Sequence, residues 1–202
     1  MVIKSTDVRY SKDYIPFTRD ELLDKVRLQM SQERFEHVLG VEKVAVELAQ
    51  QYGASIEAAS IAALIHDYAK ERKLQEMHDL IIRANLDLDL LQYGNEIWHG
   101  PVGAILAKKE LYVEDEEILN AVRHHTVGSS EMSLLEQLIY VADYIEPSRD
   151  FPGVDEARKL AKSDLAKAIS FETAHTLQYL ILKQKKIYPK AIETYNTWVA
   201  KN

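Results

Sequence analysis

Apolar residues recur every three or four positions along most of the chain, which is the spacing of one face of an α-helix. Only 7 glycines and 5 prolines interrupt this pattern, and no segment alternates between apolar and polar residues as a strand would. The sequence therefore predicts an all-α helical bundle. Helices are expected from Thr18, at Ser31–Tyr52, Ser55–Ile65, Leu74–Ala84, Pro101–Tyr112, Asp115–His125, Ser133–Ile145, Val154–Ala161, Asp164–Lys185 and Pro189–Ala200.

Local signals mark several helix ends. Thr18 and Glu21 have the spacing of a capping box, and Gly53 is expected to end the second helix. The third helix, capped by Ser55, consists of small apolar residues and is expected at the centre of the bundle. Pro101 suits the first position of a helix. The preceding residues, 85–100, are therefore predicted to form a loop with a turn or two.

Composition fits one domain. The chain has 202 residues, of which 47% are apolar, enough for a core that folds alone. Residues 1–17 lack the helical pattern and are interpreted as an N-terminal extension, followed by one domain over 18–202. The net charge of -7 argues against a nucleic-acid partner, which requires a basic surface. It does not exclude a small anionic ligand, because a bound metal ion supplies local positive charge.

The chain contains no cysteine, so any metal must bind to histidine and carboxylate side chains. The N-terminal residues show no signal peptide, and no stretch approaches the roughly 18 apolar residues of a membrane span. We therefore expect a cytoplasmic location and no membrane partner.

The pair His66-Asp67 is the sharpest chemical feature, because it ends the small apolar helix. An ionisable pair in such a place is costly unless something compensates it. Neutral imidazole and carboxylate are good ligands for divalent metals, so a bound metal ion would compensate the cost of burying this pair. The alternative is an ordinary pair at a helix end, hydrogen-bonded to the backbone.

Other histidines and acids fall on apolar helix faces. His37 shares a face with Val41 and Val44, and Asp143 lies beside the inward face of its own helix. Each could also be a core polar group satisfied by hydrogen bonds. His99 heads the helix predicted from Pro101 and could be a metal ligand or a helix cap.

The tandem pair His124-His125 presents a choice, because adjacent helical residues point about 100° apart. His125 falls on the buried face with Ile118 and Val122 and is the preferred ligand. His124 lies nearer the edge of that face and is the second candidate. The two remaining histidines, His78 and His175, share no such pattern and are interpreted as structural or solvent-facing.

These residues, in this order, resemble the HD-domain metal-dependent phosphohydrolases, whose signature is His…His-Asp…Asp. Two further histidines, His99 and His125, lie between His66-Asp67 and Asp143, and this addition resembles the dinuclear branch of that superfamily. The strings RFEHVLGV, ALIHDYAK, IWHGPVGA, VRHHTVG and YVADYIEPSR resemble the YqeK-like group, which splits diadenosine tetraphosphate symmetrically into two ADP. The resemblance covers 31–191 and implies an HD-domain helical bundle.

The resemblance also implies how the ligands divide. One metal would be held by His37, His66, Asp67 and Asp143, and the second by His99 and His125, with Asp67 bridging the two. Members of the dinuclear group often hold iron, although manganese and other divalent ions also suit such ligands. Two such cations would activate a water for attack on phosphorus.

Cationic and hydroxyl groups are expected to contact the phosphates. Lys70 lies one helical turn after His66 and is a candidate for catalysis and for substrate binding, the alternative being a solvated lysine at a helix end. Arg149 could clamp a phosphate or form a surface salt bridge to Glu146. Thr126 is a weaker candidate. The expected partner is a small nucleotide, namely a dinucleoside polyphosphate, with ADP or GDP as a product-like ligand.

Three alternatives stay open from the sequence. The first is another HD-type activity: a nucleoside 5′-phosphatase, a guanosine tetraphosphate hydrolase or a cyclic-dinucleotide phosphodiesterase. The second is a non-catalytic module that senses a nucleotide or a metal. The third is a helical scaffold whose histidines are all structural. Whether the protein forms a homodimer is also open.

Overall fold

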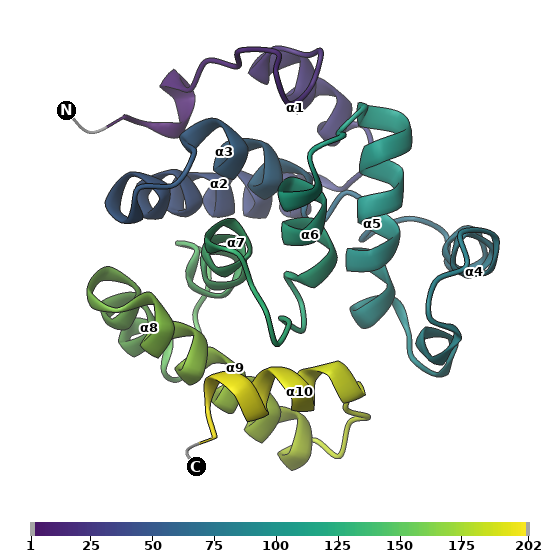
Figure 1. The fold of residues 1–202 in the computed structure, drawn as a ribbon, viewed down its shortest axis with the longest axis vertical. Coiled ribbons are helices and arrows are strands. Elements are labelled where there is room, and N and C mark those ends of the chain that lie inside the picture. The colour runs from purple at the N-terminus through teal and green to yellow at the C-terminus, as the bar shows by residue number, and fades with distance from the viewer. Residues whose placement is uncertain (1–2, 201–202) are drawn as a thin grey trace.

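The structure is a computed structural model that describes residues 3–200, and over that range its regular secondary structure is all helical, without a strand. The all-α class expected from the sequence is confirmed. Ten α-helices and two short 3-10 helices follow one another (Figure 1): η1 Ser5–Asp7, α1 Arg19–Arg27, α2 Gln32–Tyr52, α3 Ile56–Ile65, α4 Leu74–Arg83, η2 Leu88–Gln92, α5 Asn95–Leu111, α6 Glu116–His124, α7 Leu134–Ile145, α8 Val154–Ser163, α9 Leu165–Leu182 and α10 Pro189–Trp198.

The small apolar helix α3 lies at the heart of the fold, as expected. It packs against α2, α6 and α7, and eight of its ten residues are buried. Small side chains let these helices approach closely, and this brings the ends of several of them together. Helices α8, α9 and α10 form a separate layer beneath α7 (Figure 1).

The predicted helix ends agree with the structure where capping chemistry is strong. The Thr18 hydroxyl accepts a hydrogen bond from the Glu21 N–H, and the Glu21 carboxylate accepts one from the Thr18 N–H, so the capping box of α1 is confirmed. The Ser55 hydroxyl accepts a hydrogen bond from the Ala58 N–H and caps α3. Gly53 ends α2 with φ of +76°, a left-handed conformation that costs glycine little.

The largest correction concerns the start of α5, which begins at Asn95 rather than at Pro101. Pro101 therefore lies inside a helix, and His99 is neither at a helix start nor a cap. Buried packing outweighs the local preference of proline here, because Trp98 and His99 are both buried and the Trp98 indole donates to the Leu90 carbonyl at 2.6 Å. Residues 95–100, predicted as loop, thus form the first turns of the helix.

The N-terminal segment packs onto α2 and α3 through a polar network. Glu42 is fully buried and receives two hydrogen bonds from Arg19, at 2.7 and 2.6 Å, and one from Ser60 at 2.6 Å. The Tyr10 hydroxyl lies 2.9 Å from that of Ser60. A buried carboxylate is tolerated only when it is paired and hydrogen-bonded, so these contacts tie the segment and α1 to the central helices.

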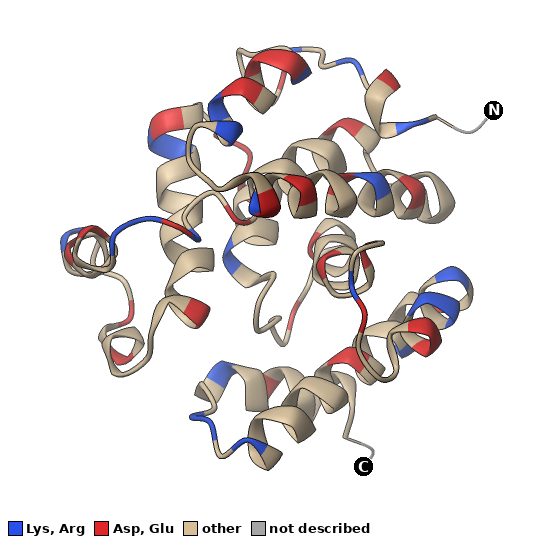
Figure 2. Ribbon diagram, turned by 180° about the vertical axis from the view of Figure 1, so that it is seen from behind, with Lys and Arg blue, Asp and Glu red and all other residues tan. Residues whose placement is uncertain are grey.

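Charged residues are spread over the helices that enclose this core. Figure 2 shows basic and acidic residues interspersed along the described chain, without a continuous basic stripe. In residues 3–200, no helix combines the length and the apolar character needed to cross a membrane.

Gly100 provides a test of how closely α5 and α6 must approach. A Cβ atom at Gly100 would lie 2.8 Å from the Arg123 carbonyl oxygen, whereas one at Gly103 would lie 3.3 Å from a Val122 methyl. We expect Gly100→Ala to lower the free energy of unfolding by about 1–2 kcal/mol, because the Arg123 carbonyl belongs to the backbone and cannot easily move away from the added methyl group.

The matched control is Gly103→Ala in the same helix. It should change the free energy of unfolding by less than about 1 kcal/mol, since alanine favours the helix and the neighbouring methyl can shift. Urea denaturation of both variants measures the difference. An equal or greater loss in Gly103→Ala would contradict this account of the contact.

Candidate metal centre

Six predicted ligand residues converge from five places in the chain. His37 lies on α2, His99 on α5 and Asp143 on α7, while His66-Asp67 and His125 follow directly after α3 and α6. All except Asp143 are buried, and that residue is partly buried. Two groups within the cluster have ligand atoms close enough to hold a metal ion: His37, His66 and Asp143, and His66, Asp67 and His125.

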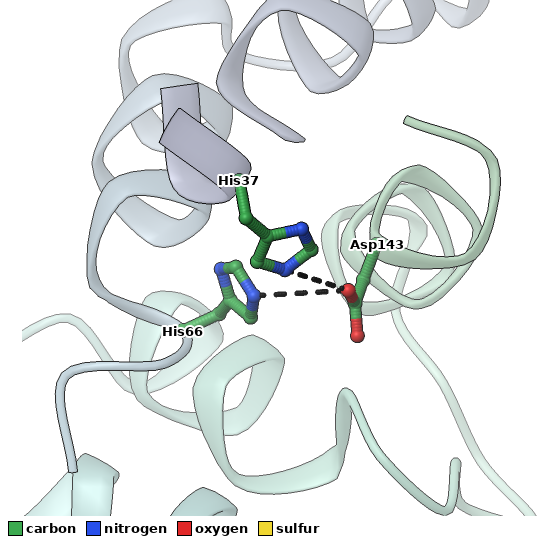
Figure 3. A group of neighbouring side chains, drawn as sticks. All are labelled: His37, His66 and Asp143. Atoms are coloured by element: carbon green, nitrogen blue, oxygen red, sulfur yellow. Dashed lines mark ion pairs between the residues drawn. The ribbon is translucent and has the colours of Figure 1, made fainter. Parts of the chain in front are cut away.

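The first half of the cluster centres on Asp143 (Figure 3). Its Oδ1 atom lies 3.1 Å from Nε2 of His37 and 3.9 Å from Nε2 of His66. The Oδ2 atom of Asp67 lies 3.7 Å from the first of these nitrogens and 3.6 Å from the second. Two imidazoles and two carboxylates therefore surround one small volume.

The second half centres on the other oxygen of Asp67. Its Oδ1 atom lies 3.3 Å from Nε2 of His99 and 3.6 Å from Nε2 of His125. These two nitrogens are themselves only 2.9 Å apart. The two oxygens of Asp67 thus face different pairs of histidines, an arrangement suited to a ligand shared between two ions.

Hydrogen bonds on the far side of each ring fix the orientation of the imidazoles. The Nδ1 atoms of His66, His99 and His125 contact the backbone carbonyls of Ala63, Asn95 and Val122 at 2.6, 2.6 and 2.8 Å. Carbonyls only accept, so Nδ1 carries the proton and Nε2 is left with a lone pair. His37 is held similarly, with Nδ1 3.2 Å from Oε1 of Glu146.

These lone pairs face one another in the buried interior. Nε2 of His37 and Nε2 of His66 are buried and make no hydrogen bond, and the close pair of His99 and His125 presents two acceptors to each other. A buried acceptor without a donor is unfavourable. A divalent cation removes this conflict, and imidazole with carboxylate is a donor set that such ions accept. The residues present therefore fit a metal centre.

The acid–base state of two imidazoles and two carboxylates in the cluster also suits a cation. Burial lowers the pKa of His66 to about 4 and that of His99 to about 3, which keeps both rings neutral at pH 7. Burial alone would raise the pKa of Asp67 and Asp143, but the surrounding imidazoles, together with Arg149 for Asp143, hold both below their usual value. Neutral imidazole and ionised carboxylate are the forms that bind metal.

The three residues predicted to contact phosphate border this cluster. The Lys70 ammonium lies 3.4 Å from both ring nitrogens of His99, and burial lowers its pKa. Thr126 places its hydroxyl 3.1 Å from Nε2 of both His99 and His125. Arg149 bonds Asp143 Oδ1 at 2.6 Å.

The alternative partner of Arg149, Glu146, is the weaker contact, since Nε of Arg149 lies 3.7 Å from its Oε1.

Two residues at the site were missed in the sequence. Arg34 donates to Oδ2 of Asp67 at 2.8 Å, and Glu146 is the buried partner of His37. Spacing was the available signal, because Arg34 lies three residues before His37 on one helix and Glu146 lies three after Asp143, so each shares a face with a ligand candidate. Arg34 and Arg149 together line a polar cavity of about 220 Å³.

The other histidines lie apart from the cluster. His124 is partly exposed, and its Nδ1 contacts Oε1 of Glu136 at 2.6 Å. Of the tandem pair, therefore, His125 reaches the cluster and His124 does not. His78 is partly exposed beside Asp79, and His175 contacts the Tyr144 hydroxyl at 2.6 Å.

Comparisons with known proteins identify relatives of this chain. The HD domain family matches residues 34–148. A protein of Bacillus subtilis named "Bis(5'-nucleosyl)-tetraphosphatase, symmetrical" is 47% identical over 182 residues, covering 90% of this chain and 98% of its own. One of the same name from Staphylococcus aureus is 38% identical, covering 83% of this chain and 88% of its own.

A solved structure is similar as well. The chain of a Clostridium acetobutylicum protein, described as a predicted HD superfamily hydrolase involved in NAD metabolism, has a TM-score of 0.82 at 38% identity. The match covers 90% of this chain and 97% of that one.

Metal content tests the cluster directly. We expect His66→Ala and Asp67→Ala to lose bound metal, because each removes a side chain from the middle of the donor set. His124→Ala, a histidine outside the cluster, should keep it. Elemental analysis of protein purified without chelator measures the content.

Thermal denaturation gives a second measurement. A metal that binds only the folded chain raises the midpoint of unfolding. Removing metal with a chelator should therefore lower the midpoint in the wild type and in His124→Ala, and leave it unchanged in His66→Ala. Full metal content in both cluster variants would refute the centre.

Proposed function

Because this chain belongs to the HD domain family, we propose that it is a metal-dependent hydrolase that splits diadenosine tetraphosphate symmetrically into two ADP. The main support for this proposal is that four imidazole Nε2 atoms lie close to the carboxylates of Asp67 and Asp143. The high identity to relatives named as symmetrical bis(5'-nucleosyl)-tetraphosphatases supports the choice of substrate.

We propose that the cluster holds two divalent ions. The first would be held by His37, His66, Asp67 and Asp143 and the second by His99 and His125, with Asp67 shared between the two. Such ions polarise phosphoryl oxygens and lower the pKa of bound water. Iron is our proposed resident metal on the resemblance to the dinuclear group, and elemental analysis decides between iron and manganese.

The reaction adds water across the central anhydride. The water oxygen forms a bond to one of the two middle phosphorus atoms, the bond from that phosphorus to the bridging oxygen breaks, and the bridging oxygen leaves as the terminal phosphate oxygen of the second ADP. Both protons of the water pass to solvent at neutral pH, because the new terminal phosphate of each ADP is then ionised. No side-chain nucleophile takes part in this proposal.

The protein groups position the phosphates and balance their charge. Arg149 offers a planar guanidinium, which suits paired contacts to phosphate oxygens. Lys70 supplies an ammonium in a buried position, where its charge acts more strongly than in water. Thr126 adds a hydroxyl beside the second pair of histidines. We propose Asp67 and Lys70 as catalytic residues and Lys70, Arg149 and Thr126 as substrate-binding residues.

The cytoplasmic location expected from the sequence remains a prediction, as does the homodimer that the sequence left open. A small nucleotide is the proposed partner, with ADP or GDP as the product-like ligand.

Product analysis tests the activity. Metal-loaded protein should convert each diadenosine tetraphosphate into two ADP, resolved by anion-exchange chromatography. Guanosine tetraphosphate, a cyclic dinucleotide and a nucleoside 5′-phosphate serve as comparison substrates and should react far more slowly. Formation of ATP and AMP in equal amounts would contradict symmetric cleavage.

Substitution of Lys70 distinguishes a role in phosphate contact from a role in metal binding. We expect Lys70→Ala to keep its full metal content and to lose about a hundredfold in kcat, the size of effect seen when one charge-stabilising donor is removed. Lys73→Ala, an exposed lysine on the same segment, is the control and should match the wild type. Unchanged turnover in Lys70→Ala would remove this residue from the proposed machinery.

A further inference from the structure

Two cavities lie on either side of the C-terminal half of α9. We name the first the aromatic pocket, of about 690 Å³, and the second the tyrosine–lysine pocket, of about 640 Å³. Each has the volume of a typical small-molecule site. Their walls meet at α9, because both are lined by Thr176 and Tyr179.

Each pocket is connected to a different half of the metal centre through one residue that lines the pocket and contacts a ligand residue. Arg149 lines the aromatic pocket and bonds Asp143 of the first half. Thr126 lines the tyrosine–lysine pocket and lies against His99 and His125 of the second half. A phosphate chain that crosses the centre would therefore have one end at each pocket.

The walls of the aromatic pocket suit a flat ring. The rings of Phe151 and His175 lie nearly parallel, at 21° with centroids 6.1 Å apart, and Tyr144 packs edge-on to Phe151 at 4.8 Å. Tyr179 adds a ring that is 54% exposed. Bases stack favourably on such aromatic faces.

The tyrosine–lysine pocket combines aromatic walls with positive charge. Tyr93 and Tyr188 meet edge to face with centroids 5.0 Å apart, and Lys185 and Lys186 lie at the pocket with them. Aromatic faces favour a base, and the ammonium groups favour the phosphates next to it. The two pockets are thus similar in kind but different in chemistry.

Most of this lining lies outside the part of the chain that matches the HD domain family, which ends at residue 148. Every residue of the aromatic pocket except Tyr144 follows that boundary, and so do the walls that α9 and α10 contribute to the other pocket. Figure 1 shows α9 and α10 as a layer below α6 and α7. The family region supplies the cluster and one wall of the tyrosine–lysine pocket, and the later residues supply the other wall and most of the aromatic pocket.

We propose that each pocket binds one nucleoside of a dinucleoside tetraphosphate, so that the two pockets hold the phosphate chain with its central bond at the metal centre. This proposal rests on the proposed function and deepens it. The position of the pockets, one beyond each half of the cluster, makes cleavage symmetric. Their different chemistry makes the enzyme bind a mixed dinucleotide in one preferred direction.

Two substitutions fill the pockets one at a time. Gln178 is exposed and lines only the aromatic pocket, and Ala191 lines only the tyrosine–lysine pocket. We expect Gln178→Trp and Ala191→Trp each to raise KM for diadenosine tetraphosphate by about tenfold or more. Ile192→Trp, at an exposed neighbouring position that lines neither pocket, is the matched control and should leave KM unchanged.

Binding of ADP gives a measurement that needs no turnover. Titration calorimetry of metal-loaded wild type and of Ile192→Trp should show two ADP per chain, and each filled variant should show one. Metal content and circular dichroism equal to those of the wild type establish that the variants are folded. A single ADP per wild-type chain, or two ADP and an unchanged KM in either filled variant, overturns the proposal.

The outcomes separate this proposal from the proposed function. If the wild type binds two ADP but does not cleave diadenosine tetraphosphate, the activity is wrong and the pocket assignment stands. If the wild type cleaves it while both filled variants behave like the control, the pocket assignment is wrong and the activity stands.

Discussion

The structure depends on a single electrostatic constraint, which is that buried imidazole lone pairs must face one another across a small volume. His66 and His125 each follow the last residue of a helix, and each gives its Nδ1 proton to a carbonyl three residues back. Carbonyls in the last turn of a helix lack their usual partner, so these bonds satisfy the helix end and turn Nε2 inward at once. The negative ends of the α3 and α6 dipoles point the same way and favour a cation there.

The rest of the fold serves to hold these helix ends in place. Helix α3 can be central because its residues are small and apolar, and Gly100 lets α5 approach the carbonyls that end α6. Glu146 and the backbone orient the rings from outside. The cluster is therefore positioned by packing between helices, whereas the aromatic pocket beside it is built mostly by residues that follow the family region.

Sequence reasoning succeeded where the signal was local. The capping residues Thr18 and Ser55 and the glycine after α2 act through neighbours in the chain, and the periodicity that turned His37 and His125 inward is a property of one helix. It failed at Pro101, because the start of α5 is decided by the burial of Trp98 and His99. The two pockets were missed because they depend on how separate helices meet. Arg34 shares a helix face with His37, but its partner Asp67 comes from another part of the chain.

The network around Glu42 has a consequence for where this domain begins. The carboxylate lies on the same helix as His37, and its partners reach back through Ser60 to Tyr10. A shortened chain that starts after Tyr10 would open this network to water, so the working unit includes residues that carry no recognisable pattern of their own.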